Sequence, residues 1–237
     1  MTYTYKDSMD AGVEKEVDSD NIAAAILSIK GREPTFEDLA EQLRVEKVAL
    51  LEHVTSFDHL ATLAGDAILD ALSLPDKQRH AHWAQWSFHY AMTIRDLISE
   101  YPIFLRQLRP RAAQVMHVER VLDNLVDLGL SNSEAMYTQF TMFSMGIGAA
   151  SSKPFGMLLR DNHQVLSDFM IAVQENLESA PRLAALLHGE QQLANIDDDM
   201  LVSTLIQFAL EGIARRRDEA LPSGLDFNYQ RQTLVAI

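Results

Sequence analysis

The sequence predicts an all-α fold. Apolar residues recur every three or four positions along most of the 237-residue chain, which is the period of a helix with one buried face. Polar residues suited to helix N-termini precede several of these stretches, and glycines or prolines follow them. There is no run of alternating β-branched residues and no Asn-Gly hairpin turn. We therefore expect helices throughout and no sheet.

The N-terminal part of the chain predicts four short helices. Residues 1–19 are polar and acidic without periodicity, so we expect a flexible arm there. Helical spacing follows the arm and stops at Gly31. Thr-x-x-Asp sequences starting at Thr35 and Thr55 predict capped N-termini for the second and fourth helices, and Arg44 begins the turn before the third. The apolar positions expected to face inward are Ile22, Ile26 and Ile29; Phe36, Leu39, Ala40 and Leu43; Val48, Leu51 and Val54; and Leu60, Leu63, Ala64, Ala67 and Ile68.

A larger helical region follows Pro75. Its first helix is long, carries an aromatic stripe and ends before Pro102. Gly129 predicts a Schellman-like helix end, and Ser131-x-x-Glu134 predicts a capping box at the next helix start. The expected segments are a long helix over 83–101, a short piece over 103–109, helices over 112–128 and 133–149, a loop over 151–155, a helix over 162–178, and a last helix over 197–217.

Composition indicates a cytoplasmic protein with two domains. The absence of cysteine excludes disulfides, thiolate metal sites and a Cys nucleophile. No apolar run reaches the roughly 18 residues needed to span a membrane, and the N-terminus lacks the basic and apolar segments of a secretory signal. We expect a small domain over 20–72 including a linking helix, a larger domain over 73–220, and a tail over 221–237.

The two short helices, joined by a tight turn between two other helices, have the plan of a helix-turn-helix motif, whose second helix enters the DNA major groove. The stretch Thr35–Leu60 reads TFEDLAEQLRVEKVALLEHVTSFDHL. It resembles the tetracycline-repressor (TetR) family pattern T-x-R-x-L-A-x-x-L-G-V-x-x-x-x-L-Y-x-H-[FV]-x-x-K-x-x-L without a gap. Weaker similarity continues over Leu122–Tyr137. The matching residues are Thr35, Leu39, Ala40, Leu43, Val45, Leu50, His53, Val54 and Leu60.

The resemblance implies a ligand-responsive, homodimeric transcriptional regulator, a repressor, that binds duplex DNA. Departures from the pattern concern the DNA contact: Glu37 replaces an Arg, Arg44 the turn Gly, and Leu51 and Phe57 the phosphate-contacting Tyr and Lys. Residues 20–60 hold four basic and eight acidic side chains, a net charge of −4 within a chain of net charge −14. Phosphate contact requires positive charge. The residues expected to face DNA are Thr35, Arg44, Lys47, Val48, Ala49 and His53, although His53 also suits a packing or capping role.

In the resembled family the larger domain encloses a small-molecule pocket, and its last helices pair two subunits. Trp86, Tyr90, Phe104, Met116 and Phe140 are therefore the candidates for contact with a small hydrophobic or aromatic ligand, with ordinary core packing as the alternative. The dimer-interface candidates are Phe143, Ile147, Leu201, Leu205 and Phe208. Ser73 and Gln107 stand near the positions of the family's metal- and drug-binding histidines. We therefore expect neither tetracycline nor magnesium, and no cofactor or metal.

Nothing in the sequence indicates a catalytic residue, so we do not expect an enzyme. His80, His82 and His89 lie at i, i+2 and i+9, where only the last two share a helix face, and this is not metal-ligand spacing. No nucleophile elbow, phosphate-binding loop or dinucleotide motif is present. Two alternatives stay open. One is a protein of the same fold that has lost DNA binding and acts as a small-molecule-binding or protein-partner co-regulator. The other is a repurposed enzyme.

Overall fold

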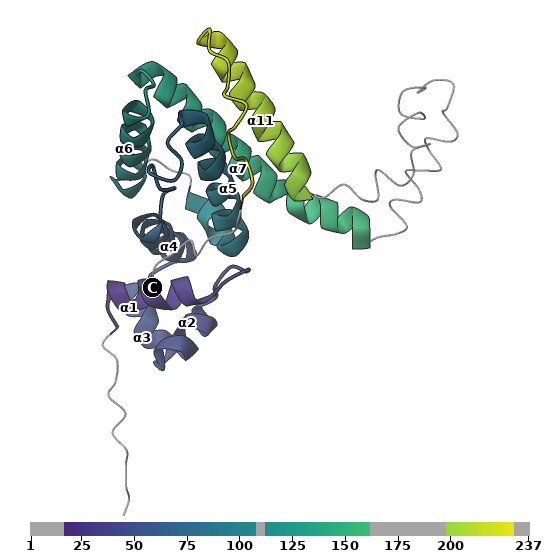
Figure 1. Ribbon diagram of the computed structural model, residues 1–237. Helices are drawn as coiled ribbons and strands as arrows, with labels where there is room; N and C mark the ends of the chain where they lie inside the picture. The colour runs from purple at the N-terminus through teal and green to yellow at the C-terminus, as the bar shows by residue number, and fades with distance from the viewer. Residues whose placement is uncertain (1–16, 108–111, 162–197, 230–237) are drawn as a thin grey trace, which may run out of the picture. The chain divides into compact units, whose positions relative to one another are not determined.

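The computed structural model describes residues 17–107, 112–161 and 198–229. All regular secondary structure in these ranges is helical apart from one isolated bridge residue, which confirms the all-α prediction (Figure 1). The chain forms two compact units. The first holds the described residues up to Asp70 together with Tyr101–Gln107, and the second holds the remainder. Parts of the predicted arm and tail, and the helix predicted over 162–178, lie outside the described residues.

The first unit contains α1 (Ser19–Ser28), α2 (Phe36–Leu43), α3 (Lys47–His53), most of α4 (Phe57–Ala71) and the short 3-10 helix η1 (Pro102–Gln107). Its core consists of aliphatic side chains that are almost completely buried. They come from every one of the α-helices, which is why such short helices are stable only together. These residues are Ile22, Ile26, Leu39, Leu43, Leu50, Val54, Leu60, Ala64 and Ile68.

The helix starts of the first unit are set by local sequence. Asp18 caps α1 by accepting a hydrogen bond from the Asn21 N–H at 2.7 Å. Ser56, rather than the predicted Thr55, precedes α4, where its Oγ accepts from the His59 N–H at 3.1 Å. The prediction placed this cap one residue early because both hydroxyl residues suit the position.

Tyr101–Gln107 packs with the first unit, whereas the sequence-based boundary at residue 73 assigns this segment to the larger domain. The Tyr101 hydroxyl donates to the Leu27 carbonyl at 3.1 Å. Arg106 pairs with Glu33 at 2.8 Å, and its guanidinium lies 5.2 Å from the Phe57 ring centre. These contacts are made between residues far apart in sequence, so local patterns do not reveal them.

The second unit contains α5 (Trp83–Glu100), α6 (Ala112–Asp127), α7 (Asn132–Asp161) and α11 (Asp198–Arg216). Helices α5, α7 and α11 contact one another, and α6 packs on α7 (Figure 1). Helix α5 is buried almost all round, which identifies it as the centre of this unit. In the described ranges, no helix is both long and apolar enough to cross a membrane.

Helices α6 and α7 meet at a predicted turn. Gly129 adopts φ 96°, a left-handed conformation that favours glycine, and the Leu130 N–H donates to the Leu125 carbonyl at 3.1 Å. The Ser131 Oγ and Glu134 carboxylate then form the predicted capping box. The loop predicted over 151–155 is wrong, because α7 continues through Pro154 to Asp161. Proline removes one backbone donor from a helix, but at Pro154 this does not end α7.

Helices α5 and α7 pack closely against each other at Gly146. A Cβ atom added at Gly146 would lie 2.7 Å from the Ala91 carbonyl oxygen and 2.9 Å from the Ile94 side chain. Both distances are shorter than real Cβ contacts. Glycine at this position therefore permits the two helices to pack at their observed separation.

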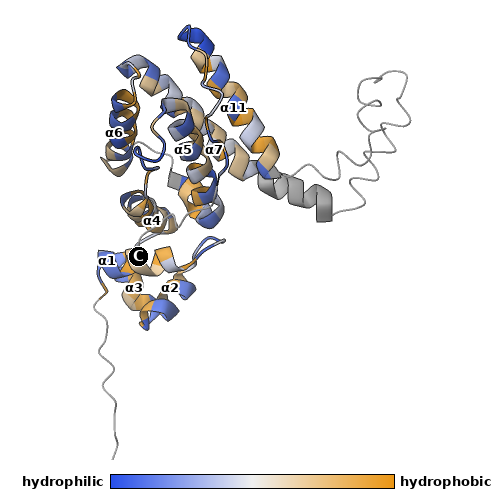
Figure 2. Cartoon of the chain, viewed as in Figure 1, coloured by the Kyte–Doolittle hydropathy of each residue, from blue (hydrophilic) through white to orange (hydrophobic). Residues whose placement is uncertain are grey.

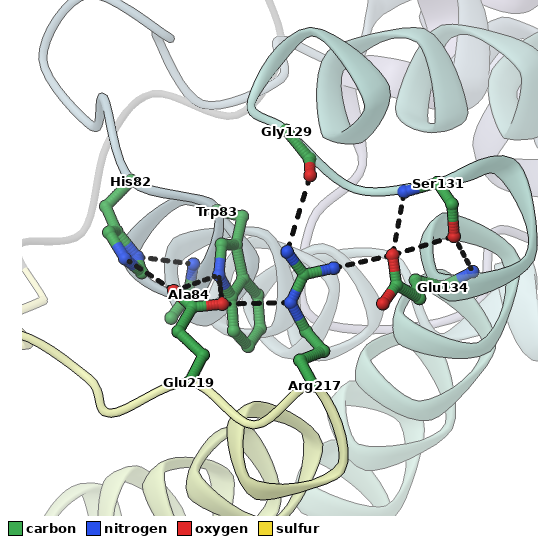
Figure 3. A network of polar contacts seen from close by, with 8 residues as sticks. All are labelled: His82, Trp83, Ala84, Gly129, Ser131, Glu134, Arg217 and Glu219. Carbon is green, nitrogen blue, oxygen red and sulfur yellow. Dashed lines mark hydrogen bonds and ion pairs between the residues drawn. The ribbon is translucent and has the colours of Figure 1, made fainter.

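Arg217, just after the C-terminal end of α11, forms ion pairs and a ring contact with other parts of the second unit (Figure 3). Its guanidinium pairs with Glu134 at 2.6 Å and with Glu219 at 2.9 Å, and lies 5.6 Å from the Trp83 ring centre. The Trp83 indole N–H donates to Glu219 at 3.1 Å. The arginine run at this helix end thus includes one residue with a tertiary role, beyond the favourable interaction of Arg215 and Arg216 with the helix dipole.

Candidate functional site

The start of α2 is held by the predicted capping box. Thr35 Oγ1 accepts from the Asp38 N–H at 3.1 Å, and the Asp38 carboxylate accepts from the Thr35 N–H at 2.8 Å. Arg32 also pairs with Asp38 at 2.5 Å. These contacts hold the pKa of Asp38 well below its usual range, chiefly through the Arg32 hydrogen bond. Thr35 remains exposed, and its side chain oxygen is committed to the cap.

The turn between α2 and α3 depends on a left-handed residue. Arg44 has φ 58° and ψ 43°, and its N–H donates to the Glu41 carbonyl at 3.1 Å. This is the position at which the TetR pattern has glycine. A residue with a side chain is strained there by roughly 1 kcal/mol, so the fold tolerates Arg44 at a small cost. The Arg44 side chain is exposed.

Helix α3 buries one side and exposes another. Leu50 is fully buried, and Val54 is fully buried just beyond the helix end. Val48 is 68% exposed and Leu51 is 39% exposed, so their prediction as inward positions is wrong. The seven-residue helix turns them away from the core that Leu50 occupies. Of the other residues expected to face DNA, Lys47 and His53 are exposed and Ala49 is half-buried.

Most positive charge in the first unit is paired with carboxylates. Lys47 pairs with Glu37, Arg32 with Asp38, and Arg106 with Glu33. The remaining two basic residues described in this unit are Lys30, which lies 5.9 Å from the Tyr101 ring centre, and Arg44. The hydrogen bond from Lys47 lowers the pKa of Glu37. A DNA phosphate approaching Lys47 must therefore compete with Glu37.

In the second unit, two predicted ligand residues lie together. Trp86 and Tyr90 are buried on α5, with their rings stacked at a centroid distance of 5.6 Å. The Trp86 indole N–H donates to the Pro75 carbonyl at 2.8 Å. This bond fixes the Trp86 ring and leaves the Tyr90 hydroxyl as the polar group of the pair.

Two polar residues that sequence patterns do not identify lie close to the Tyr90 hydroxyl. His117 on α6 is buried, and its Nε2 lies 3.2 Å from Tyr90 Oη. Gln139 on α7, also buried, hydrogen-bonds to the same hydroxyl. Burial lowers the pKa of His117 to about 4 and raises that of Tyr90, so both groups are neutral near pH 7. The only sequence signal was a polar residue on an apolar helix face, which is too common to identify a site.

The other predicted ligand residues have different surroundings. Phe104 is buried in η1 of the first unit. Met116 on α6 is 60% exposed, and Phe140 on α7 is 69% exposed. The structure therefore brings Trp86 and Tyr90 together and leaves Met116 and Phe140 on the surface of the second unit. The assignment of these residues to a ligand site stays a prediction.

Exposed apolar residues follow one face of α7 and one face of α11. Figure 2 shows the apolar residues that recur along α11. Phe208 is 62% exposed, whereas the predicted interface residues Phe143 and Ile147 on α7 are half-buried. We name two surfaces: the α7 stripe consists of Met136, Tyr137, Phe140 and Gly148, and the α11 stripe consists of Leu201, Leu205, Phe208 and Gly212.

The segment after α11 covers another part of α5. Phe227 packs edge-on against Phe88 at 5.2 Å, and Tyr229 lies 5.8 Å from His89. His80 stacks on His89 at 3.8 Å, because it precedes α5 in a loop instead of lying on the helix. The expectation that His80 does not share the face of His89 is therefore wrong. Burial lowers the pKa of both, that of His89 to about 4.

Comparison with solved structures identifies the fold. No protein-family profile and no curated protein matches the chain. The Streptomyces coelicolor TetR family protein ActR in complex with (S)-DNPA aligns with a TM-score of 0.60 and 18% identity, over 84% of this chain and 98% of that one. ActR in complex with actinorhodin aligns with a TM-score of 0.57 and 17% identity, over 85% and 97% of the two chains. Apo ActR gives 0.56 and 19%, over 84% and 95%.

Proposed function

We propose that this chain, which has the fold of TetR family proteins, is a homodimeric, ligand-responsive transcriptional repressor and not an enzyme. The observation that carries the proposal is the exposed side of α3. Leu50 and Val54 anchor the helix, while Lys47 and Val48 project from it. A short helix held in this way suits insertion into a major groove. A protein with this role would work in the cytoplasm, where it could reach DNA.

The exposed side chains of α3 suit base contact better than phosphate contact. Val48 can pack against a thymine methyl group, which is an ordinary form of apolar base readout. Lys47 can reach a phosphate or a guanine once it separates from Glu37. We therefore expect specific binding with few phosphate contacts and a shallow dependence on salt.

The exposed stripes on α7 and α11 support dimerisation. A pair of helices with apolar, solvent-facing stripes forms a four-helix bundle when a second copy covers them. Gly148 and Gly212 continue the two stripes, and a Cβ atom added at either would have no atom within 4 Å apart from the nearby backbone of its own helix. Such residues leave room for close approach of a partner helix. A dimer would place two copies of α3 on successive major grooves, about 34–36 Å apart.

Ligand binding in the second unit completes the proposed mechanism. Two of the ActR structures contain a ligand, (S)-DNPA in one and actinorhodin in the other. The buried Trp86–Tyr90 pair of this chain suits a small hydrophobic or aromatic molecule. A ligand changes DNA binding only if its affinity differs between the DNA-bound and free conformations. We expect the ligand to bind the DNA-free conformation more tightly, so that the protein dissociates from DNA and repression ends.

Titration of the protein with a selected duplex across a salt series tests DNA binding. The proposal predicts tight binding that weakens with salt, and Lys47→Glu should weaken it by at least about 1 kcal/mol. Arg216→Glu on α11 is the matched control, because it makes the same charge change in the second unit. Equal effects of the two substitutions would remove α3 from the DNA interface.

A second candidate rests on the charge distribution of the first unit. The pairing of Arg32, Lys47 and Arg106 with carboxylates favours a protein of this fold that no longer binds DNA and acts as a co-regulator through a protein partner. Absence of binding to any duplex near 50 mM salt, in a protein that still dimerises, would favour this candidate over the first.

A further inference from the structure

Arg44 occupies the turn between α2 and α3 in a left-handed conformation, with φ 58° and ψ 43°. Two backbone hydrogen bonds define this turn. The Arg44 N–H donates to the Glu41 carbonyl at 3.1 Å. The Val45 N–H donates to the Ala40 carbonyl at 3.0 Å. This pattern ends a helix with one residue of positive φ, so the turn fixes the backbone of Arg44, and glycine would fit it without strain.

The long side chain is the unusual feature of this position. In the described ranges, Asp218, with φ 54°, is the other non-glycine residue of positive φ. A short polar side chain such as that of Asp218 suits this conformation, because it can hydrogen-bond to the nearby backbone. The Arg44 side chain makes no such bond. Strained backbone positions that persist in a fold are common at functional sites, so the conformation of Arg44 favours a role for its side chain.

Arg44 is also the one lysine or arginine in the described part of the first unit whose side chain has no partner there. Its exposed acidic neighbours Glu41 and Glu46 do not pair with it. An anion can therefore approach the exposed Arg44 guanidinium without displacing a carboxylate of the protein. The other four basic side chains are held by carboxylates or lie near an aromatic ring, and they are Lys30, Arg32, Lys47 and Arg106.

The position of Arg44 next to α3 identifies the anion that it suits. Arg44 lies three residues before Lys47, the first residue of α3, and three residues span at most about 11 Å. The DNA major groove is about 12 Å wide, and a sugar–phosphate backbone follows each of its edges. A helix that enters the groove therefore brings the residue just before it close to one edge. A guanidinium group suits a phosphate there, because it donates two parallel N–H bonds.

We propose that the Arg44 guanidinium binds a backbone phosphate at the edge of the groove that α3 enters. The inference rests on the proposed DNA binding and adds to it the residue that anchors the protein to the sugar–phosphate backbone. Arg44 is a positioning residue in this account, because phosphate contacts fix the register and orientation of a protein on DNA without reading sequence. Val48, exposed on α3, faces the bases instead.

Three substitutions of Arg44 separate its charge from its backbone strain. Arg44→Gln removes the charge and keeps the strain, Arg44→Gly removes both, and Arg44→Lys keeps both. Affinity for a duplex selected from a random library should fall about eightfold per bound subunit at 0.1 M salt in both Arg44→Gln and Arg44→Gly, since one phosphate contact is lost. Arg44→Lys should stay close to the parent protein, because lysine also binds phosphate. Arg44→Gly should melt at a higher temperature than Arg44→Gln, because glycine adopts this φ freely.

Two readouts distinguish a phosphate contact from a structural role. In Arg44→Gln the slope of log affinity against log salt should become shallower by about 0.9 for each bound subunit. The same substitution should weaken binding to the selected duplex and to a duplex of scrambled sequence by the same factor. Val48→Ala, three residues into the exposed side of the motif, is the control. It should weaken binding to the selected duplex alone and leave the salt slope unchanged.

The outcomes separate this inference from the proposed function. Parent-like affinity and salt slope in Arg44→Gln, with a parent protein that binds the duplex, overturn the phosphate contact and leave DNA binding intact. A loss confined to Arg44→Gly overturns it as well, because the turn conformation and not the charge would then be responsible. An equal loss in Arg44→Lys and Arg44→Gln does the same. A parent protein that binds neither duplex near 50 mM salt overturns both the contact and the proposed function.

Discussion

Lys47, the first residue of α3, pairs through its ammonium group with the Glu37 carboxylate of α2. Both side chains are well exposed, so water screens the pair and its contribution to stability is small. Its importance is for recognition. Glu37 forms an ion pair with the only lysine of α3, so this lysine is not free to contact a phosphate. Glu37 also adds a negative charge to the surface proposed to contact DNA.

Glu37→Gln should strengthen DNA binding. The substitution removes a negative charge and releases Lys47 for phosphate contact, which should increase the slope of log affinity against log salt by about 0.9. Fluorescence anisotropy with a labelled duplex at several salt concentrations measures both effects. Glu41→Gln, on the same helix and also exposed, is the control, because it changes the charge equally without releasing Lys47. The ion-pair account fails if the two variants behave alike.

Gly146→Ala should destabilise the second unit by about 1–3 kcal/mol, because the added methyl group collides with the Ala91 carbonyl and Ile94. Gly148→Ala in the same helix is the matched control, and both variants are compared in the Phe208→Glu background, because Gly148 also lies on the α7 stripe proposed to meet a second copy. Its Cβ meets nothing within 4 Å, and alanine favours a helix over glycine by roughly 0.5–1 kcal/mol. Urea unfolding of both variants should therefore give changes of opposite sign. A loss of stability confined to Gly148→Ala would contradict the close contact of α5 and α7.

Phe208→Glu should shift the protein from dimer to monomer. The side chain lies in the middle of the exposed α11 stripe, where a second copy would desolvate the new carboxylate without offering a partner. Sedimentation velocity over a range of concentrations measures the change. Val115→Glu places the same charge at another exposed apolar position, on α6, and should leave the association unchanged. If Phe208→Glu remains as dimeric as the parent protein, the α11 stripe is not the interface.

Stability should fall as pH decreases from about 6.5 towards 4, with His89 contributing to the change. Burial lowers the folded-state pKa of His89 to about 4, with the charge of His80 opposing protonation further, whereas an unfolded histidine titrates near about 6.5. Between these values the unfolded state binds more protons, so the His89 contribution is present above pH 6.5 and is lost below it. One histidine gives a slope of at most about 1.4 kcal/mol per pH unit.

His89→Phe keeps a buried ring and removes this titration. The free energy of unfolding, measured by urea titration at pH 7.5 and pH 5, should depend less steeply on pH in the variant. His53→Phe, at an exposed position of α3, serves as the comparison. An unchanged pH dependence in His89→Phe would show that protonation of His89 does not lower the free energy of unfolding.

Local sequence was sufficient for much of the fold. Capping boxes at Thr35 and Ser131 involve residues three positions apart, so their hydrogen bonds can be predicted without tertiary information. The Gly129 helix end is equally local. Pro154 shows the limit of such signals, because the expected break does not occur and α7 continues through it.

The site required tertiary information. His117 and Gln139 reach Tyr90 only because α5, α6 and α7 pack together, and no spacing within one helix indicates that meeting. Helical periodicity also identifies an apolar face without showing what covers it. Phe140, predicted to contact a ligand, therefore has the same sequence signal as a core residue and yet lies exposed on the α7 stripe.

Selection from a random duplex library followed by sequencing tests the central claim most directly. The account predicts enrichment of a two-fold symmetric sequence at about 50 mM salt, with half-site centres about one helical turn or a small multiple of it apart, because two copies of α3 would read successive major grooves. Phe208→Glu and Lys47→Glu should each weaken the enrichment. A library that remains unenriched after repeated rounds, with protein that is folded and dimeric, would contradict DNA binding by this chain.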